Sequence, residues 1–485
     1  MEEDSSESQG LGMDVAGDMV DPFSGDEHSP PRSHHCAVRT MAIKYITETQ
    51  ANTNFMLFDS SSSSSEEEGG TWGGSLPGKA PNKQRDFVLA YETLVRQYFS
   101  GEDSVYDEQD FERRFRMPRV VFMKIKEVLI GEPPFIHQVD AKGATGIHPL
   151  VRLTACLRKL AYGTASDHAD DQFEISNSVV NRDFLVFCQI ITAKLGRYLN
   201  TSPTQEVMAQ IQAVNAGRGF PGMFASWDCK YFPWQLCPVA QQGQYQSGAK
   251  PSPSLVLEAI CDPHLYIWYH HFGLPGSLND INVLDRSSIV TTILDGSMDL
   301  YKQPYKINNA VRDYLYFLVD GIYPSWAIFI DTFHNPQNEK QNHFAKVQEG
   351  CRKDIERAFG VLVQKWKILQ QPLRNWYLED IKTILDTCII LHNMVVEHNR
   401  DTYTINNWVS NQLAEHQLVN DGNVVHLTLF GNNNQGQPDQ AVMGPGQALL
   451  RAQALATTYD DQMRHDSLKD DLVEHNWNIK MAGNG

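Results

Sequence analysis

The sequence has little that would mark a disulfide framework, a zinc module or a membrane protein. Its eight cysteines are scattered over 485 residues, with no Cys-x-x-Cys pair and no paired Cys/His spacing. This usage argues against a closed zinc site and suits a reducing compartment. No apolar run approaches the roughly 18 residues of a bilayer span, and the acidic first residues lack the basic-then-apolar order of a signal peptide. We therefore expect a soluble intracellular protein with no membrane partner.

Basic side chains are also fewer than acidic ones, 41 against 59, which gives a net charge of −18. The deficit lies at the ends: residues 1–80 hold 4 basic and 14 acidic side chains, and residues 401–485 hold 4 and 10. Residues 81–400 then hold 33 basic and 35 acidic side chains, so the middle is nearly neutral. Global acidity therefore does not exclude a nucleic-acid partner, and local basic clusters decide the question.

Length and composition divide the chain into four parts. Residues 1–84 are rich in Ser, Gly, Glu and Asp and bury too little apolar surface to fold, so we expect a disordered acidic tail. Residues 85–215 have helical periodicity, and residues 216–400 mix strand and helix patterns. Residues 401–485 are polar and acidic, which predicts a largely flexible tail, with some helix near residues 447–455.

The helical part carries four arginines in seven residues, close to a helix that we expect to begin at Pro118. Two interpretations of these arginines are open: a patch that contacts phosphates, or ordinary solvated faces of helices. These arginines are Arg113, Arg114, Arg116 and Arg119.

Three further helices are predicted over residues 149–163, 166–173 and 177–192. A short helix, a tight turn and a second helix form the helix-turn-helix arrangement, whose second helix enters the major groove of DNA. Arg182 is the cation that this second helix offers. A purely structural cluster of three helices fits the pattern equally well.

From residue 222 the hydrophobic period becomes strand-like. Alternation around Asp228 predicts one strand, and two apolar runs flanking an Asp-Pro-His turn predict an antiparallel hairpin. A helix that opens at Ser277 and runs through residue 293 is expected next, then two short strands and a polar loop before the helix of Glu356. This order favours a mixed α/β sheet with helices on its faces. The predicted strands are residues 224–235, 255–261, 265–272, 316–320 and 327–330.

Residues 351–369 have the clearest helical pattern, because apolar residues recur at steps of four and three. Glu356 borders this stripe, with Arg352, Lys353 and Arg357 beside it. A carboxylate ringed by cations can reach both a metal and a phosphate backbone, whereas the alternative is a solvated helix with i,i+4 ion pairs. The stripe consists of Ile355, Phe359, Leu362, Trp366 and Leu369. A final helix is predicted over residues 378–396.

Asp228, Asp320 and Glu356 are the candidate catalytic and metal-binding residues. Phosphodiester cleavage is served by two Mg²⁺ ions held by carboxylate oxygens, and these acids come from two predicted strands and a neighbouring helix. Asp320 could instead cap the turn that follows its strand. Asp280 is the rival second aspartate, but Ser277-x-x-Asp280 has the spacing of a capping box, which we favour.

Five blocks in order resemble PIF/Harbinger-type DDE transposases, the plant transposon protein group. The blocks are residues 226–238 (SWDCKYFPWQLCP), 272–287 (FGLPGSLNDINVLDRS), 319–324 (VDGIYP), 352–362 (RKDIERAFGVL) and 390–394 (ILHNM). Residues 111–122 also resemble the arginine-rich block that precedes the helix-turn-helix of that family. Trp227 and Lys230 depart from the residues usual around the first aspartate.

The resemblance implies an α/β, RNase H-like sheet flanked by helices, preceded by an all-α helix-turn-helix-like domain. It implies cleavage and strand transfer of double-stranded DNA at transposon ends, with Asp228, Asp320 and Glu356 holding Mg²⁺ (or Mn²⁺), as two ions. It further implies a nuclear location and a separate Myb-like partner, and it leaves homo-oligomerisation open. The alternative is a domesticated derivative that binds DNA or a protein without cutting. The cations expected to contact DNA are Arg113, Arg114, Arg116, Arg119, Arg182, Arg352, Lys353 and Arg357.

Overall fold

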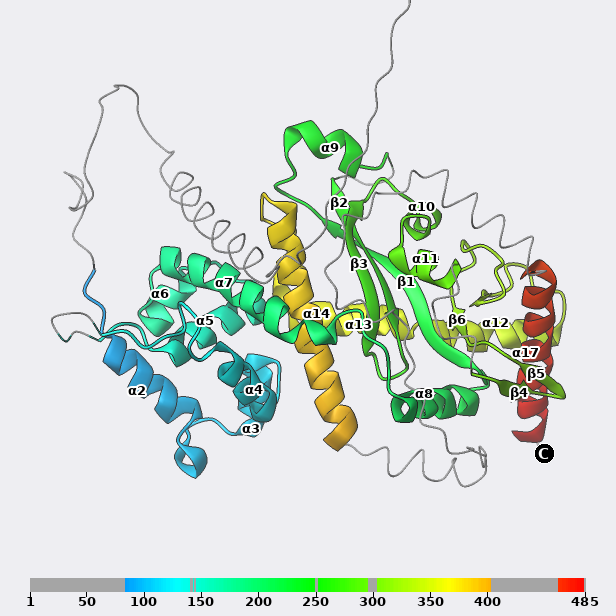
Figure 1. The fold of residues 1–485 in the computed structure, drawn as a ribbon, viewed down its shortest axis with the longest axis horizontal. Coiled ribbons are helices and arrows are strands. Elements are labelled where there is room, and N and C mark those ends of the chain that lie inside the picture. Colours follow the sequence, from blue (N-terminus) through cyan, green and yellow to red (C-terminus); the bar gives the residue numbers. More distant parts are fainter. Residues whose placement is uncertain are drawn as a thin grey trace, which may run out of the picture. The chain divides into compact units, whose positions relative to one another are not determined.

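The computed structural model describes residues 83–139, 143, 145–248, 252–294, 303–402 and 461–483 (Figure 1). The tail predicted over residues 1–84 lies outside these ranges except for its last two residues, as does the helix predicted near residues 447–455. No helix within the described ranges is long and apolar enough to cross a membrane.

The first described part is helical, as the periodicity predicts. Side-chain caps start several of its helices: Asp107 accepts a hydrogen bond from the backbone of Asp110, and Thr204 from that of Val207. Gly163 ends one helix in the left-handed conformation, with φ 61°. The helices are α2 (Phe87–Tyr98), α3 (Glu108–Phe115), α4 (Arg119–Leu129), α5 (Pro149–Tyr162), α6 (His168–Phe173), α7 (Asn177–Leu195) and α8 (Gln205–Gly217).

A five-stranded mixed sheet follows, with strand order β3-β2-β1-β6-β7. The first three strands are antiparallel neighbours, whereas β6 runs parallel to β1 and β7 parallel to β6. The hairpin and the later strands occur where the apolar runs predict them. The strands are β1 (Met223–Pro233), β2 (Ser254–Cys261), β3 (Ile267–Pro275), β6 (Tyr316–Leu318) and β7 (Phe329–Ile330), and β4 (Tyr305–Ile307) and β5 (Ala310–Arg312) form a separate pair.

Helices connect and cover these strands (Figure 1). The single helix expected after Ser277 is in fact two short ones, and the polar segment expected to be a loop before Glu356 contains a full helix. The helices are α9 (Val239–Tyr245), α10 (Asp280–Leu284), α11 (Ser288–Leu294), α12 (Glu339–Arg352), α13 (Asp354–Lys365) and α14 (Leu378–Thr402), with a 3-10 turn, η4 (Lys367–Leu369), after α13.

The two faces of the sheet are buried against different helices. On one face, α13 and α14 pack on β1, β2 and β3, and all five residues of the predicted α13 stripe are at most 4% exposed. This cluster continues without interruption into α4, α5 and α7, so the helical part and the sheet share one core. On the other face, residues of β1, β6 and β7 pack with α8 and α12.

The prediction of a largely flexible tail after residue 400 is wrong for its last described segment. Residues Asp461–Gly483 form α17, which packs against α12, β4 and β7. Leu468 and Leu472 are buried in the second core, and Asp331, just after β7, pairs with Lys469 at 2.7 Å. Only a few apolar residues anchor this helix, so its sequence has no strong amphipathic pattern.

Candidate active site

Asp228 lies in the middle of β1, the central strand of the sheet. Its Oδ1 accepts a hydrogen bond from the backbone of Cys229 at 2.8 Å, and its side chain is 17% exposed. The pKa of Asp228 is raised from 3.8 to about 6, mainly by burial and to a smaller extent by the carboxylates of Asp280 and Asp320, while the Cys229 N–H and Arg352 oppose the rise. Two other acids therefore lie close enough to Asp228 to repel its charge.

Asp320 comes just after β6, the strand that lies next to β1 and runs parallel to it. Its Oδ1 accepts from the backbone of Gly321 at 2.8 Å, which is the turn-capping contact expected as an alternative. A Cβ on Gly321 would lie 2.5 Å from the ring of the exposed His334, which would have to move to make room for it. The Asp320 side chain therefore both caps its own turn and lies near Asp228.

Gln348 is a positioning residue that the sequence analysis did not single out. It is fully buried on α12, and its Nε2 donates to the carbonyl oxygens of Val319 at 3.1 Å and Ile330 at 3.0 Å. These carbonyls immediately precede Asp320 and Asp331, so one amide ties the ends of β6 and β7 together. The sequence gives no signal for this role of Gln348, because a polar residue is ordinary in a segment that is expected to be a loop.

Arg352 joins the first and third candidate carboxylates. It ends α12, and Glu356 lies in the first turn of α13. Arg352 Nη1 donates to Asp228 Oδ2 at 3.3 Å, and Nη2 lies 3.0 Å from Glu356 Oε1. The Arg352 side chain is 13% exposed and Glu356 is 47% exposed. A residue expected to contact DNA thus places its positive charge between two acids.

The capping prediction for Asp280 is wrong. Asn279 is the N-cap of α10 and accepts from the backbone of Asn282 at 2.9 Å, whereas Asp280 is the first residue of the helix. The Asp280 carboxylate instead accepts from the hydroxyl of Tyr231 on β1 at 2.8 Å. Asp280 is therefore held beside Asp228 by a tertiary contact, which the local spacing of possible caps could not show.

Glu258 on β2 is a further buried acid that the sequence analysis did not consider. It is fully buried opposite Cys229, and its Oε1 accepts from Trp227 Nε1 at 3.0 Å. Burial raises the pKa of Glu258 to about 8. At neutral pH it is largely protonated and adds little negative charge beneath the site.

The donor set matches the chemistry of Mg²⁺, which prefers hard carboxylate oxygens. Asp228, Asp280, Asp320 and Glu356 supply only such oxygens. Within the described ranges, however, no three acidic, histidine or cysteine side chains already converge as a metal site. The guanidinium of Arg352 pairs with both Asp228 and Glu356, so its positive charge is stabilised by these two carboxylates. Convergence on an ion would require Arg352 to release at least one carboxylate.

The arginine block of the helical part is mostly engaged in internal contacts. Arg114 donates to the Tyr98 hydroxyl at 2.6 Å and lies 3.5 Å from the Tyr106 ring centroid. Arg119 pairs with Glu108 at 2.9 Å, and Arg116 lies 5.3 Å from the ring centroid of Tyr162. Arg113 also forms an ion pair, with Asp110 on the same helix, but its side chain is 65% exposed. Arg113 is therefore the best placed of the four for DNA.

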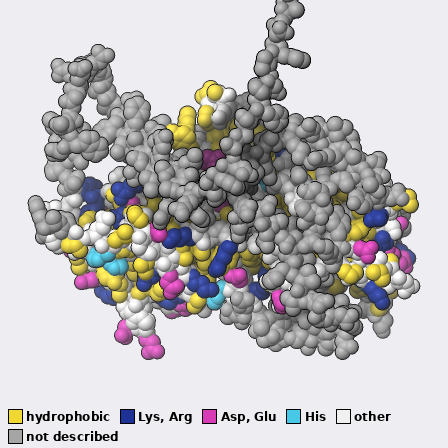
Figure 2. Space-filling view, viewed as in Figure 1, with side chains coloured by type: hydrophobic (Ala, Val, Ile, Leu, Met, Phe, Trp, Pro, Cys, Tyr) yellow, Lys and Arg dark blue, Asp and Glu magenta, His cyan; other side chains and the backbone are white. Residues whose placement is uncertain are grey.

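The remaining predicted DNA contacts are divided in the same way. Arg182 is 48% exposed and pairs with the buried Asp183, which also pairs with Arg152. Arg357 is 51% exposed and pairs with Asp354, and Lys353 lies at the junction of α12 and α13. Figure 2 shows basic and acidic side chains interspersed over the described part of one face. Contact with DNA stays a prediction for all of these residues.

Comparison with known proteins identifies the part of the chain that carries this site. The family model described as "Plant transposon protein" matches residues 196–403, which include all four carboxylates. Over residues 196–403 the chain is therefore similar to the plant transposon protein family. A domain of unknown function matches residues 91–129, and no solved structure matches the chain.

Curated relatives of the chain are distant. "Protein ALP1-like" from Arabidopsis thaliana is 22% identical over 322 residues, covering 64% of this chain and 76% of its own. "Putative nuclease HARBI1" from Bos taurus and from Homo sapiens are each 22% identical over 264 residues, covering 53% of this chain and 70% of theirs. The chain is thus similar to proteins of which some carry the name of putative nuclease, and α17 lies beyond the matched family region.

Proposed function

We propose that the chain is a Mg²⁺-dependent DNA endonuclease of the DDE transposase type, acting on double-stranded DNA at transposon ends in the nucleus. The observation that carries this proposal is that Asp320 lies close enough to Asp228 to raise its pKa, while Arg352 joins Asp228 to Glu356. A central strand flanked by an antiparallel and a parallel neighbour, with order β3-β2-β1-β6-β7, supports an RNase H-like fold. Mg²⁺, as two ions, would stabilise the attacking and leaving oxygens of the phosphodiester.

The chain's own residues have separable parts in this proposal. Asp228 and Asp320 are presented by adjacent parallel strands, and Gln348 fixes the backbone before Asp320. Arg352 holds Glu356 toward Asp228 and becomes free to meet a DNA phosphate when it releases them. Asp280 is a fourth carboxylate at the same edge, oriented by Tyr231. The α6–α7 pair and a separate Myb-like protein are proposed to direct DNA binding.

A second function, DNA or protein binding without cleavage, is favoured by one observation. The Arg352 bridge neutralises two carboxylates and leaves no converged metal site among the described residues. In that case the same surface would bind a partner while the acids serve the fold.

The deciding experiment incubates the full chain with linear DNA carrying candidate transposon ends, with Mg²⁺ or with a chelator. Nicked and joined products and DNA binding are measured on the same samples. Asp228→Asn and Asp320→Asn should abolish Mg²⁺-dependent cleavage and keep binding, whereas Asp285→Asn, at the other end of α10, should cut normally. Binding without any cleavage by the unmodified chain would establish the second function. Loss of cleavage in Asp280→Asn but not in Asp320→Asn would make Asp280 the second catalytic aspartate.

A further inference from the structure

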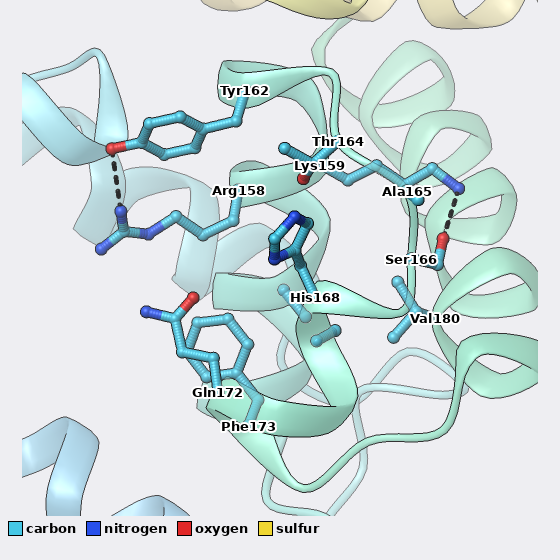
Figure 3. A pocket seen from close by; sticks show the side chains of 12 residues that line it. Arg158, Lys159, Tyr162, Thr164, Ala165, Ser166, His168, Gln172, Phe173 and Val180 are labelled. Carbon is cyan, nitrogen blue, oxygen red and sulfur yellow. Dashed lines mark hydrogen bonds between the residues drawn. The ribbon is translucent and has the colours of Figure 1, made fainter.

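A separate cavity lies in the helical part, formed by the C-terminal half of α5, the connection to α6, α6 itself and the start of α7 (Figure 3). Its volume is about 220 Å³, which is room for roughly seven waters at ~30 Å³ each. The residues that line it come from outside the candidate active site, so it is a distinct feature of the molecule.

The polar side chains of this cavity are mostly hydrogen-bond donors. Arg158 and Lys159 are cations, and Tyr162, Ser166, His168 and Gln172 add hydroxyl, imidazole and amide groups. Figure 3 shows Arg158 and Lys159 extending to opposite sides, with His168 between them. No aspartate or glutamate belongs to the described lining, so the cavity is complementary to a negatively charged ligand.

The partners of Arg158 are neutral. Its guanidinium donates to the hydroxyls of Tyr162 and Tyr98, each at 3.0 Å, and lies 4.9 Å from the ring centroid of Phe115. Its Nε is buried and has no hydrogen-bond partner. These contacts hold the guanidinium in place without neutralising it.

The partners of Lys159 are neutral as well. Its ammonium donates to Ser166 Oγ at 3.0 Å and to Asn181, and it lies 4.8 Å from the ring centroid of Phe184. Burial lowers the pKa of Lys159, because removing a cation from water without a counter-charge is costly. Across the described ranges, neither Lys159 nor Arg158 forms a salt bridge with a carboxylate, so two adjacent cations lack compensation.

The backbone at this cavity is held by a close approach. Gly163 ends α5 with φ 61°, and a Cβ there would lie 2.7 Å from the carbonyl oxygen of Lys367 in η4. The turn that carries Thr164 and Ser166 is therefore fixed against the segment following α13. A site whose walls are fixed in advance loses less entropy when it binds a ligand.

We propose that this cavity binds a phosphate-bearing ligand, with Lys159 and Arg158 supplying the positive charge and His168 and Gln172 the remaining hydrogen bonds. A phosphate has more acceptor oxygens than a carboxylate, which suits this number of donors, and cations with fixed hydroxyls are its usual partners. The source is either a small phosphorylated molecule such as a nucleotide or the 5′-phosphate of a DNA strand. The inference does not depend on nuclease activity.

The test uses the full chain without metal and titrates inorganic phosphate and AMP by calorimetry, with chloride at matched ionic strength as the salt control. Phosphate should bind with measurable heat and raise the unfolding temperature, and chloride should do neither. Lys159→Met should weaken binding roughly tenfold, the loss expected for a charge-assisted hydrogen bond. His168→Ala, at an exposed position, should weaken binding with the fold intact, and Lys124→Gln, an exposed cation on α4, should leave it unchanged.

Two DNA strands that differ only in a 5′-phosphate or 5′-hydroxyl distinguish the sources by fluorescence anisotropy. Preference for the phosphorylated strand, lost in His168→Ala, identifies a DNA end. Equal binding of both strands together with tight AMP binding identifies a free nucleotide. Absence of phosphate and AMP binding, or binding equal in the unmodified chain and both pocket variants, overturns the proposal. Because cleavage is not measured, this outcome is independent of the nuclease test.

Discussion

Arg352 Nη1 and Asp228 Oδ2 lie 3.3 Å apart, and this contact joins the end of α12 to the central strand of the sheet. The same guanidinium reaches Glu356, so the charge balance of the candidate active site depends on one side chain.

Replacement of Arg352 by Gln should raise the pKa of Asp228 above its value of about 6. The loss of a nearby opposite charge shifts a carboxyl pKa by ~1 unit or more. Carbon-13 NMR of labelled aspartate side chains, recorded against pH without metal, measures the change. Arg357→Gln is the matched control, because Arg357 pairs with Asp354 and not with Asp228. An unchanged Asp228 titration in Arg352→Gln would show that the pair has no electrostatic effect.

Asp228→Asn should stabilise the metal-free protein at pH 8 by about 1–3 kcal/mol. The folded-state pKa of Asp228 is raised, so the folded protein holds its proton more tightly than the unfolded chain does. The stability from this group is present below pH 3.8, falls as pH rises to about 6, and stays lost above that. Urea unfolding at several pH values should therefore show the two proteins diverging between pH 4 and pH 6. Parallel curves across that range would contradict the assignment.

Arg113 and Arg114 should behave in opposite ways despite being neighbours. Arg114→Gln loses the Tyr98 hydrogen bond and the Tyr106 ring contact, which should cost about 1–2 kcal/mol of unfolding free energy. Arg113→Gln should leave stability nearly unchanged, because its side chain is 65% exposed. In DNA binding, Arg113→Gln should reduce the log–log salt slope by ~0.9. A slope that does not change would remove Arg113 from the DNA interface.

Leu472→Ala in α17 should destabilise the whole described body by about 2–5 kcal/mol, since Leu472 is fully buried in the second core. Met463→Ala in the same helix removes a side chain that is 67% exposed and should cost little. Thermal unfolding followed by tryptophan fluorescence compares the two. Equal midpoints would mean that α17 is not an integral part of the fold.

The elements predicted best from sequence are those whose burial is local and periodic. The stripe of residues 355–369 and the β2–β3 hairpin are buried as the pattern predicts, because each buries one continuous face. The helix predicted over residues 351–369 is shorter than expected, since α13 ends at Lys365 and the last two residues of the stripe follow it. The helix α12 was expected to be a loop, since only Phe344, Gln348 and Cys351 are buried among many polar residues. Periodicity detects a helix by its apolar face, and a mostly polar helix leaves too small a face to detect.

The candidate site was less predictable than the fold, because its members meet through tertiary contacts. Asp228 and Asp320 occupy the strand positions expected, but nothing local shows that Asp280 reaches Tyr231 or that Arg352 bridges two acids. The spacing of residues in the sequence predicts which helix or strand carries a side chain. It does not predict which of several nearby charges that side chain faces.

The position of α17 has a consequence for how the protein is made. Asn476 of α17 donates to the carbonyl oxygen of Gly219, at the entrance to β1, and Lys469 pairs with Asp331 after β7. The ribosome synthesises a chain from its N-terminus at roughly 5–20 residues per second. The segments from β1 to α14 therefore emerge well before α17. During that interval the surface that α17 covers is open to chaperones and to other nascent chains. Completion of the second core therefore follows the emergence of the sheet rather than accompanying it.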